Sequence, residues 1–210
     1  MGSEQATNLV GVSIFLIRWF SPNVLTLAAL LVNVIPCCLL VIFFGYEYDG
    51  PIDAWMSYMI GYSYMIYIFL DASDGKQARR IGASSPLGML FDHGCDAVVA
   101  VINSTLMQRI FCCGTNPYHL FAMMIAIFPF YFVTMEQHYT GEMNFPEING
   151  VDEGSVVIFT LAILSGIYGN ANLWKAKVML PYFNQEVEVH EILLKAVIAG
   201  IYPYALQCFY

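Results

Sequence analysis

The chain has 210 residues, of which 59% are hydrophobic and only 11% are charged, and its formal net charge at pH 7 is -8. This composition excludes an ordinary soluble domain, in which about a quarter of the residues are charged, and it predicts a polytopic membrane protein. The acidic charge and the lack of a basic stripe exclude a nucleic-acid-binding surface. If so acidic a chain binds a phosphate group, metal ions must lie between the phosphate and the carboxylates, because both are negatively charged.

The first 20 residues have the character of a helix that lies in the membrane interface. Residues 8–20 combine Ile, Leu, Trp and Phe side chains with one arginine, in a run too short and too interrupted to cross a bilayer. No charged segment, short apolar run and cleavage site precede it, so we expect no removable signal peptide. The sequence Ser21-Pro22-Asn23 that follows is a helix-start signal.

Apolar runs of spanning length then follow one another along the chain. We expect an all-α integral membrane fold of about six transmembrane helices, preceded by the interfacial amphipathic helix. The expected division is an N-terminal segment (1–20), a core (21–170), and a loop with a final helix (171–210). The expected helices cover residues 23–44, 55–70 continuing toward 80, 87–110, 117–138, 151–169 and 191–210, and the expected loops include residues 170–190.

The distribution of charge predicts the orientation in the membrane. Loops rich in Lys and Arg stay in the cytoplasm, so we expect the N-terminus and the loop over residues 71–86 to be cytoplasmic. Lys175 and Lys177 fall on the opposite side, which conflicts mildly with the rule. The residues that set the orientation are Arg18, Lys76, Arg79 and Arg80 on one side, and Glu47, Asp49 and Asp53 on the other.

Four aspartates, at 71, 74, 92 and 96, lie within or beside the second and third expected helices. One aspartate at the centre of a membrane helix costs about 2.5 to 3.5 kcal/mol, so four oppose insertion by about 10 kcal/mol. Lys76, Arg79 and Arg80 cannot neutralise four carboxylates and also leave charge for an anionic substrate. Bound divalent metal ions would supply the positive charge that these three side chains cannot.

The spacing places each pair of aspartates on one helix face. Asp71 and Asp74 are three residues apart, and Asp92 and Asp96 are four apart. If the two helices are antiparallel neighbours, the faces converge just below the membrane surface. A set of hard oxygen ligands suits Mg²⁺, Mn²⁺ or Ca²⁺ and lacks the nitrogen and sulfur ligands that zinc prefers.

Small residues are interleaved with these aspartates. Gly75, Ala78 and Gly88 would open space for a bulky ligand, although spacing of this kind often only packs membrane helices together. Their combination with four aspartates and Arg79 favours a binding site.

This constellation resembles the signature of the CDP-alcohol phosphotransferase family. The segments DGKQARR at 74–80 and SSPLG..FDHGCD at 84–96 are similar to its choline- and ethanolaminephosphotransferase branch, and SPNVLT at 21–26 and residues 136–154 agree. The resemblance covers residues 18–170 and departs at Met89, where Glu is usual, and at Val151, where Pro is usual. Members of this branch are longer and have more helices. The signature positions are Asp71, Asp74, Gly75, Ala78, Arg79, Gly88, Asp92 and Asp96.

The resemblance implies transfer of phosphoethanolamine or phosphocholine from CDP-ethanolamine or CDP-choline to diacylglycerol, which gives the phospholipid and CMP. It implies Mg²⁺ or Mn²⁺, with two ions, as cofactor, membrane lipid as surroundings, and a homodimer. It also implies residence in the endoplasmic reticulum or Golgi, with the active site facing the cytoplasm. The alternative is a truncated, weakly active or inactive member that acts as a membrane partner of a full-length enzyme.

By the same resemblance, Asp71, Asp74 and Asp92 are metal ligands, and Asp96 is either a fourth ligand or the base that deprotonates the acceptor hydroxyl. His93 is the competing base, because imidazole titrates near neutral pH, or it braces a ligand.

The remaining expected site residues would bind substrate. Arg79 would contact a phosphate oxygen, Gly75, Ala78 and Gly88 would make room for the nucleotide, and Asn23 would close the pocket. Two glutamates, Glu136 and Glu153, either face the ammonium group of the substrate or belong to a solvated acidic loop.

Overall fold

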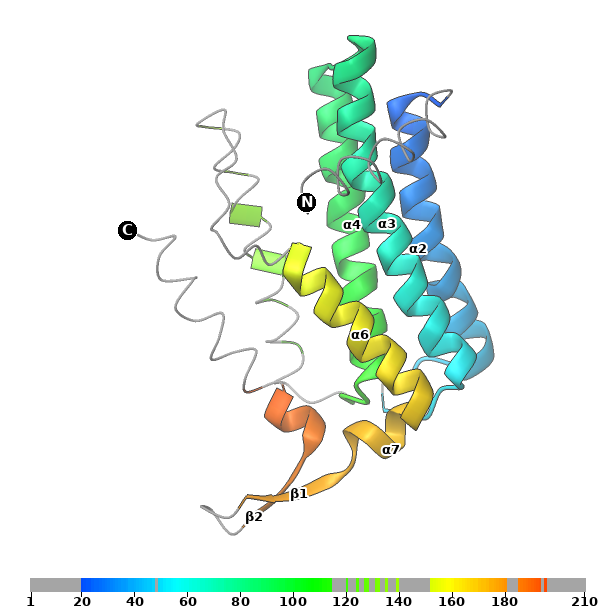
Figure 1. Cartoon of the computed structure of the whole chain (residues 1–210), viewed down its shortest axis with the longest axis vertical. Helices are drawn as coiled ribbons and strands as arrows, with labels where there is room; N and C mark the ends of the chain where they lie inside the picture. Colours follow the sequence, from blue (N-terminus) through cyan, green and yellow to red (C-terminus); the bar gives the residue numbers. More distant parts are fainter. Residues whose placement is uncertain are drawn as a thin grey trace, which may run out of the picture.

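The computed structural model describes residues 20–47, 49–114, 152–180, 185–193 and 195, with single residues between 120 and 139 (Figure 1). The expected interfacial helix lies outside these ranges, as do most of the expected helices over 117–138 and 191–210. The single described residues between 120 and 139 are helical, as are residues 189–193 and 195.

Three long helices form the centre of the fold: α2 (Pro22–Phe44), α3 (Ala54–Ile81) and α4 (Pro86–Ile110). They confirm the helices expected over 23–44, 55–80 and 87–110. Proline at the first helical position suits the starts of α2 and α4, and the Ser85 hydroxyl accepts the Gly88 N–H at 3.1 Å as an N-cap. Gly82 ends α3 in the left-handed conformation, with φ of 67°, that glycine adopts without strain.

Within the part of the chain described by the structure, α2 is the one helix that is long and apolar enough to cross a membrane, by length and composition alone. The helices α3 and α4 have 28 and 25 residues but carry the four aspartates. The helix α6 (Asp152–Tyr168) agrees with the expected run over 151–169 and has 17 residues. Six membrane spans therefore stay a prediction.

The expected loop over 170–190 is wrong in most of its described length. It contains the short helix α7 (Asn170–Trp174) and two antiparallel strands, β1 (Lys177–Leu180) and β2 (Gln185–Glu188). The register pairs Lys177 with Glu188 and Leu180 with Gln185. The fold is therefore mostly helical but not all-α as expected, because it includes this small sheet. The Lys177 ammonium lies 3.4 Å from the Glu186 carboxylate across the two strands.

The helices α2, α3, α4 and α6 pack into a bundle whose two ends differ. The helix α2 packs against α3 and α4, and α3 packs against α6. A core of fully buried side chains, which includes Met56, Ile60, Leu106 and Ile110, lies where α3 begins and α4 ends. The turn from α3 to α4, which follows the first two aspartates, lies at the opposite end from α7 and the hairpin (Figure 1).

At the core end, Asn170 of α7 ties several segments together. Its Oδ1 accepts the Ile52 N–H at 3.1 Å. Its Nδ2 lies 3.4 Å from the carbonyl oxygens of Gly50 and Arg109 and 3.1 Å from Cys112 Sγ. Since Asn170 is only 1% exposed, one buried amide fixes the α2–α3 loop, the end of α4 and α7.

Candidate functional site

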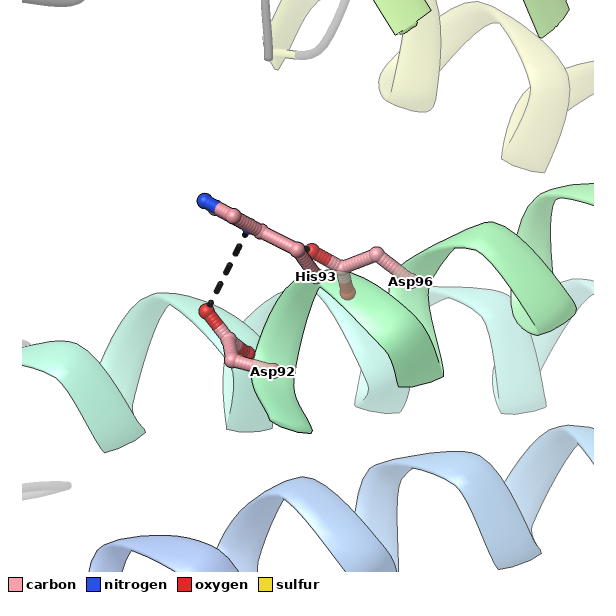
Figure 2. Close-up of side chains that lie close together, drawn as sticks. All are labelled: Asp92, His93 and Asp96. Carbon is pink, nitrogen blue, oxygen red and sulfur yellow. Dashed lines mark ion pairs between the residues drawn. The ribbon is translucent and has the colours of Figure 1, made fainter. Parts of the chain in front are cut away.

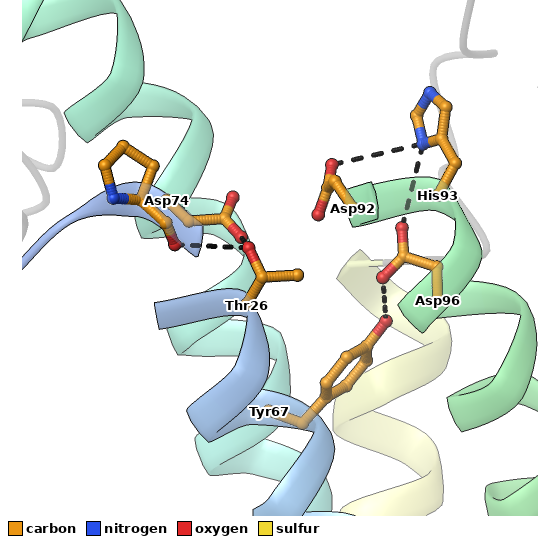
Figure 3. Close-up of polar contacts among 7 residues, drawn as sticks. Thr26, Tyr67, Asp74, Asp92, His93 and Asp96 are labelled. Carbon is orange, nitrogen blue, oxygen red and sulfur yellow. Dashed lines mark hydrogen bonds and ion pairs between the residues drawn. The ribbon is translucent and has the colours of Figure 1, made fainter. Parts of the chain in front are cut away.

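The structure brings three of the four aspartates into one compact group. Asp71 and Asp74 on α3 and Asp92 on α4 each present a carboxylate oxygen, and these atoms lie within 4.8 Å of one another. A second group of the same compactness joins Asp92, His93 and Asp96. Asp92 belongs to both groups and so lies at the centre of the site (Figure 3).

The convergence follows from helix periodicity and from the short turn between the two helices. Asp71 and Asp74 lie on one stripe of α3, and Asp92 and Asp96 lie one turn apart on α4. The turn over residues 82–85 makes α3 and α4 antiparallel, so the last turns of one meet the first turns of the other. The site is therefore built on regular helices and not on loops.

The residues fit a divalent metal ion. Asp92 Oδ1 is buried and has no hydrogen-bond partner within the described residues, so a buried acceptor is available to a ligand. No ion pair within the described ranges joins Arg79 or Arg80 to the aspartates. Clustered carboxylates without a cation are unfavourable in a low-dielectric interior, and an oxygen-only donor set suits Mg²⁺ or Mn²⁺.

The helix α2 contributes a residue that sequence analysis missed. The Thr26 hydroxyl donates a hydrogen bond to Asp74 Oδ2 at 2.5 Å and lies 3.2 Å from the Pro22 carbonyl oxygen (Figure 3). Both Thr26 and Asp74 are buried. The available signal was the position of the threonine one turn into the helix that SPNVLT begins, but nothing in the sequence places that turn against α3.

A second missed residue is Tyr67, whose hydroxyl donates to Asp96 Oδ1 at 2.8 Å. Its position one turn before Asp71 was the available signal. The ring of Tyr64 stacks on the Tyr67 ring with 6.4 Å between the centroids, and the Tyr64 hydroxyl lies 3.2 Å from the Ser155 hydroxyl of α6. The helix α6 thus reaches the neighbourhood of the carboxylates through two tyrosines.

His93 lies between two carboxylates. Its Nδ1 is 4.0 Å from Asp92 Oδ2 and 3.9 Å from Asp96 Oδ2, while the other ring nitrogen points away from both (Figure 2). These separations exceed hydrogen-bond length. The position suits both of the expected roles, a proton acceptor and a brace for the carboxylates.

The expected nucleotide-binding residues gather at the same end of the bundle. Asn23 at the start of α2 faces the start of α4, since its Oδ1 would lie 3.7 Å from a Cβ placed on Gly88. A Cβ on Gly75 would lie 3.7 Å from the Arg79 guanidinium, and Arg79 itself is exposed. Ala78 lies half-buried in the last turns of α3.

The two glutamates expected at the ammonium group are not placed by the structure. Glu136 lies outside the described residues, and Glu153 is in the first turn of α6 with its side chain outside the described part. Ser155, two residues later, contacts Tyr64 of α3. The first turn of α6 therefore lies near α3.

Comparison with known proteins identifies the family of the chain. The family model for CDP-alcohol phosphatidyltransferase matches residues 19–180. The chain is 34% identical over 177 residues to a Dictyostelium discoideum protein named as CDP-alcohol phosphatidyltransferase class-I family protein 3, covering 77% of this chain and 43% of the relative. It is 34% identical over 176 residues to choline/ethanolaminephosphotransferase 1 of Arabidopsis thaliana, covering 83% and 44%.

Cholinephosphotransferase 1 of Gallus gallus is 37% identical over 167 residues, which cover 77% of this chain and 48% of the relative. The chain thus spans less than half the length of these relatives. The family match nevertheless includes every described residue of the site, from Asn23 to Asp96. The chain belongs to the CDP-alcohol phosphatidyltransferase family.

Proposed function

We propose that the chain transfers phosphoethanolamine or phosphocholine from the CDP-amino alcohol to diacylglycerol, which gives phosphatidylethanolamine or phosphatidylcholine and CMP. The observation that carries the proposal is the convergence of Asp71, Asp74 and Asp92 within 4.8 Å in a chain of this family. The relatives named as choline- and ethanolaminephosphotransferases support the choice of head group.

The reaction forms a bond between the diacylglycerol oxygen and the phosphorus that carries the amino alcohol. The bond from that phosphorus to the oxygen of CMP breaks, and the hydroxyl proton passes to a base. Asp71, Asp74 and Asp92 would hold the divalent ions, with Asp96 as a further ligand or as the base. When bound, Mg²⁺ or Mn²⁺ would neutralise the diphosphate and stabilise the leaving CMP.

Two residues suit the role of base. His93 has one ring nitrogen 3.9 Å from Asp96, and the carboxylate would stabilise the imidazolium that forms. Asp96 is the alternative, because it lies outside the compact group of Asp71, Asp74 and Asp92. The variant His93→Gln separates the two, since a reaction that keeps most of its rate without the imidazole assigns the proton to Asp96.

The substrate would lie between the first turns of α2 and α4 and the last turns of α3. Arg79 would pair with a phosphate oxygen in the forked geometry that guanidinium favours, and Asn23 would close the nucleotide pocket. Gly75, Ala78 and Gly88 would leave room for cytidine.

Glu136 and Glu153 would face the ammonium group. If they do, replacing both with glutamine changes the preference between CDP-choline and CDP-ethanolamine, and an unchanged preference removes them from the site. We further propose that the chain forms a homodimer in the membrane of the endoplasmic reticulum or Golgi, with the active site facing the cytoplasm.

The test uses membranes that contain this 210-residue chain, incubated with diacylglycerol, Mg²⁺ and labelled CDP-ethanolamine or CDP-choline. We expect phospholipid product that disappears in chelator and in Asp92→Asn, and the label that is incorporated names the head group. The matched control is Asp53→Asn, which changes an exposed aspartate at the opposite end of α3. Absence of product from the folded, membrane-inserted chain would overturn the proposal.

A further inference from the structure

The Tyr67 hydroxyl donates a hydrogen bond to Asp96, one of the four aspartates of the site. It lies one helical turn before Asp71 and two turns before Asp74, so the phenol and both carboxylates share a stripe of α3. In the antiparallel pairing of α3 with α4, this places the ring opposite Asp96 (Figure 3). The contact comes from the side of Asp96 that is nearer the middle of the bundle.

The hydrogen bond divides the two oxygens of Asp96 between different neighbours. Oδ1 accepts from Tyr67 at 2.8 Å, and Oδ2 lies 3.9 Å from His93 Nδ1. The terminal torsion of an aspartate is broad and has no strong preference of its own. A donor fixed on Oδ1 therefore sets the direction in which Oδ2 points.

Tyr67 is itself held in place. Its ring stacks on that of Tyr64, with an angle of 27° between the planes, and the Tyr64 hydroxyl contacts Ser155 of α6 at 3.2 Å. Both rings are half-buried. Contacts from α3 and α6 thus restrain the phenol, which makes it a rigid donor for a carboxylate on α4.

We propose that Tyr67 is a positioning residue that holds Asp96 with one oxygen directed toward His93. For catalysis this proposal rests on the proposed transferase function, but the hydrogen bond itself can be tested without activity. Whether Asp96 acts as metal ligand or as base, misplacement of its Oδ2 atom would slow the chemical step more than it would weaken substrate binding.

The first measurement is a double-mutant cycle on the apparent melting temperature of the full chain in chelator, without substrate. The variants are Tyr67→Phe, Asp96→Ala and their combination. We expect Tyr67→Phe to lower the melting temperature by about 2–4 °C in the wild-type background and to have almost no effect beside Asp96→Ala. Such coupling identifies residues that act through one contact.

The matched control is Tyr64→Phe, in the same pair of backgrounds. It removes the hydroxyl of the neighbouring stacked ring, whose partner is Ser155 and not a carboxylate, so its effect should be equal with and without Asp96. If Asp96→Ala does not fold, Asp96→Ser takes its place in the cycle.

The second measurement compares kcat and KM of Tyr67→Phe with those of the wild type and Tyr64→Phe. A misplacement of reacting groups by about 1 Å costs up to about 100-fold in rate. We therefore expect kcat of Tyr67→Phe to fall about 10- to 100-fold while KM for the CDP-alcohol stays nearly constant. Tyr64→Phe keeps the ring that stacks on Tyr67 and removes only the contact with Ser155, so its kcat should fall much less than that of Tyr67→Phe, with KM nearly constant.

If the shift in melting temperature of the double variant equals the sum of the shifts of Tyr67→Phe and Asp96→Ala, the proposed contact between Tyr67 and Asp96 is wrong. An active wild type with an unchanged kcat in Tyr67→Phe, or a loss that falls on KM alone, would overturn the positioning role. A wild-type chain with no activity would count against the proposed function only, because the cycle would still decide whether Tyr67 holds Asp96.

Discussion

The two ends of the helical bundle are built on opposite principles. At the end where α3 begins, apolar side chains such as Met56, Ile60 and Leu106 are fully buried, and the Asn170 amide satisfies groups from several segments. At the other end, four carboxylates gather, and Asp92 Oδ1 is buried without a partner in the described residues. The first end stabilises the fold, and the second keeps the groups that a cation would satisfy.

This contrast explains how the fold tolerates such a concentration of like charge. A site that violates the rules of favourable burial persists when the surrounding structure supplies the missing stability. Here α3 and α4 run through both ends, so packing at the core end fixes the helices that carry the aspartates. Substitutions at the two ends should therefore have opposite effects on stability and activity.

The largest expected effect is on activity at the carboxylate end. Asp92→Asn should lower the transferase rate about 1000-fold, the upper scale for losing one group that stabilises transition-state charge. The melting temperature of the metal-free chain should rise or stay constant, since one of several repelling charges is removed. A steep fall in the metal-free melting temperature would contradict the contrast. Activity and thermal unfolding in chelator, measured on one preparation, provide the check.

Next comes a pure packing change at the core end. Leu106→Ala should lower the free energy of unfolding by about 2–5 kcal/mol, the range for deleting a buried leucine side chain, and leave kcat per folded molecule nearly unchanged. Leu106 is 0% exposed, whereas the matched control Val101→Ala changes a residue of α4 that is 43% exposed. Denaturant unfolding gives the stability difference. Equal losses in the two variants would show that α4 is not packed there as described.

A smaller loss of stability is expected from Asn170→Ala. The change leaves the Ile52 N–H and the Arg109 carbonyl without their buried partner, and an unsatisfied buried group costs about 1–3 kcal/mol. Thermal unfolding should detect it, while the KM for CDP-alcohol should not change. The control is Asn172→Ala, because Asn172 is exposed on the same short helix. A change in KM would show that packing at the Asn170 end affects substrate binding at the carboxylate end, which would contradict the separate roles of the two ends.

The smallest effect returns to the carboxylate end. Thr26→Val keeps the shape of the side chain and removes its hydrogen bond to Asp74. The net contribution of a single hydrogen bond is about 0.5–1.5 kcal/mol, so the Mg²⁺ concentration needed for half-maximal activity should rise by up to about tenfold. Thr26→Ser keeps the hydroxyl and should retain the wild-type value. An unchanged metal requirement in Thr26→Val would separate Thr26 from the ion site.

Much of the site could be predicted because its spacing is local. The separation of Asp71 from Asp74, and of Asp92 from Asp96, fixes a shared helix face whatever the rest of the fold does. The starts of α2 and α4 follow from prolines with preceding serines, and the end of α3 from Gly82. These features depend on backbone preferences of a few adjacent residues.

The hairpin could not be predicted in the same way. Residues 177–188 mix apolar and charged side chains over short stretches, and strands of four residues give little periodicity. Their pairing becomes favourable through cross-strand contacts such as Lys177 with Glu186. A reading of consecutive residues therefore finds a polar loop where the fold has a sheet.

The sequence by itself determined the three long helices, the acidic faces of α3 and α4, and the family to which they belong. Only the tertiary structure decided that Thr26 meets Asp74, that Tyr67 meets Asp96, and that Asn170 closes the opposite end. The physical reason is range. Helical faces arise from bonds between residues three or four apart, whereas these contacts join residues 29 to 118 positions apart and depend on how whole helices pack.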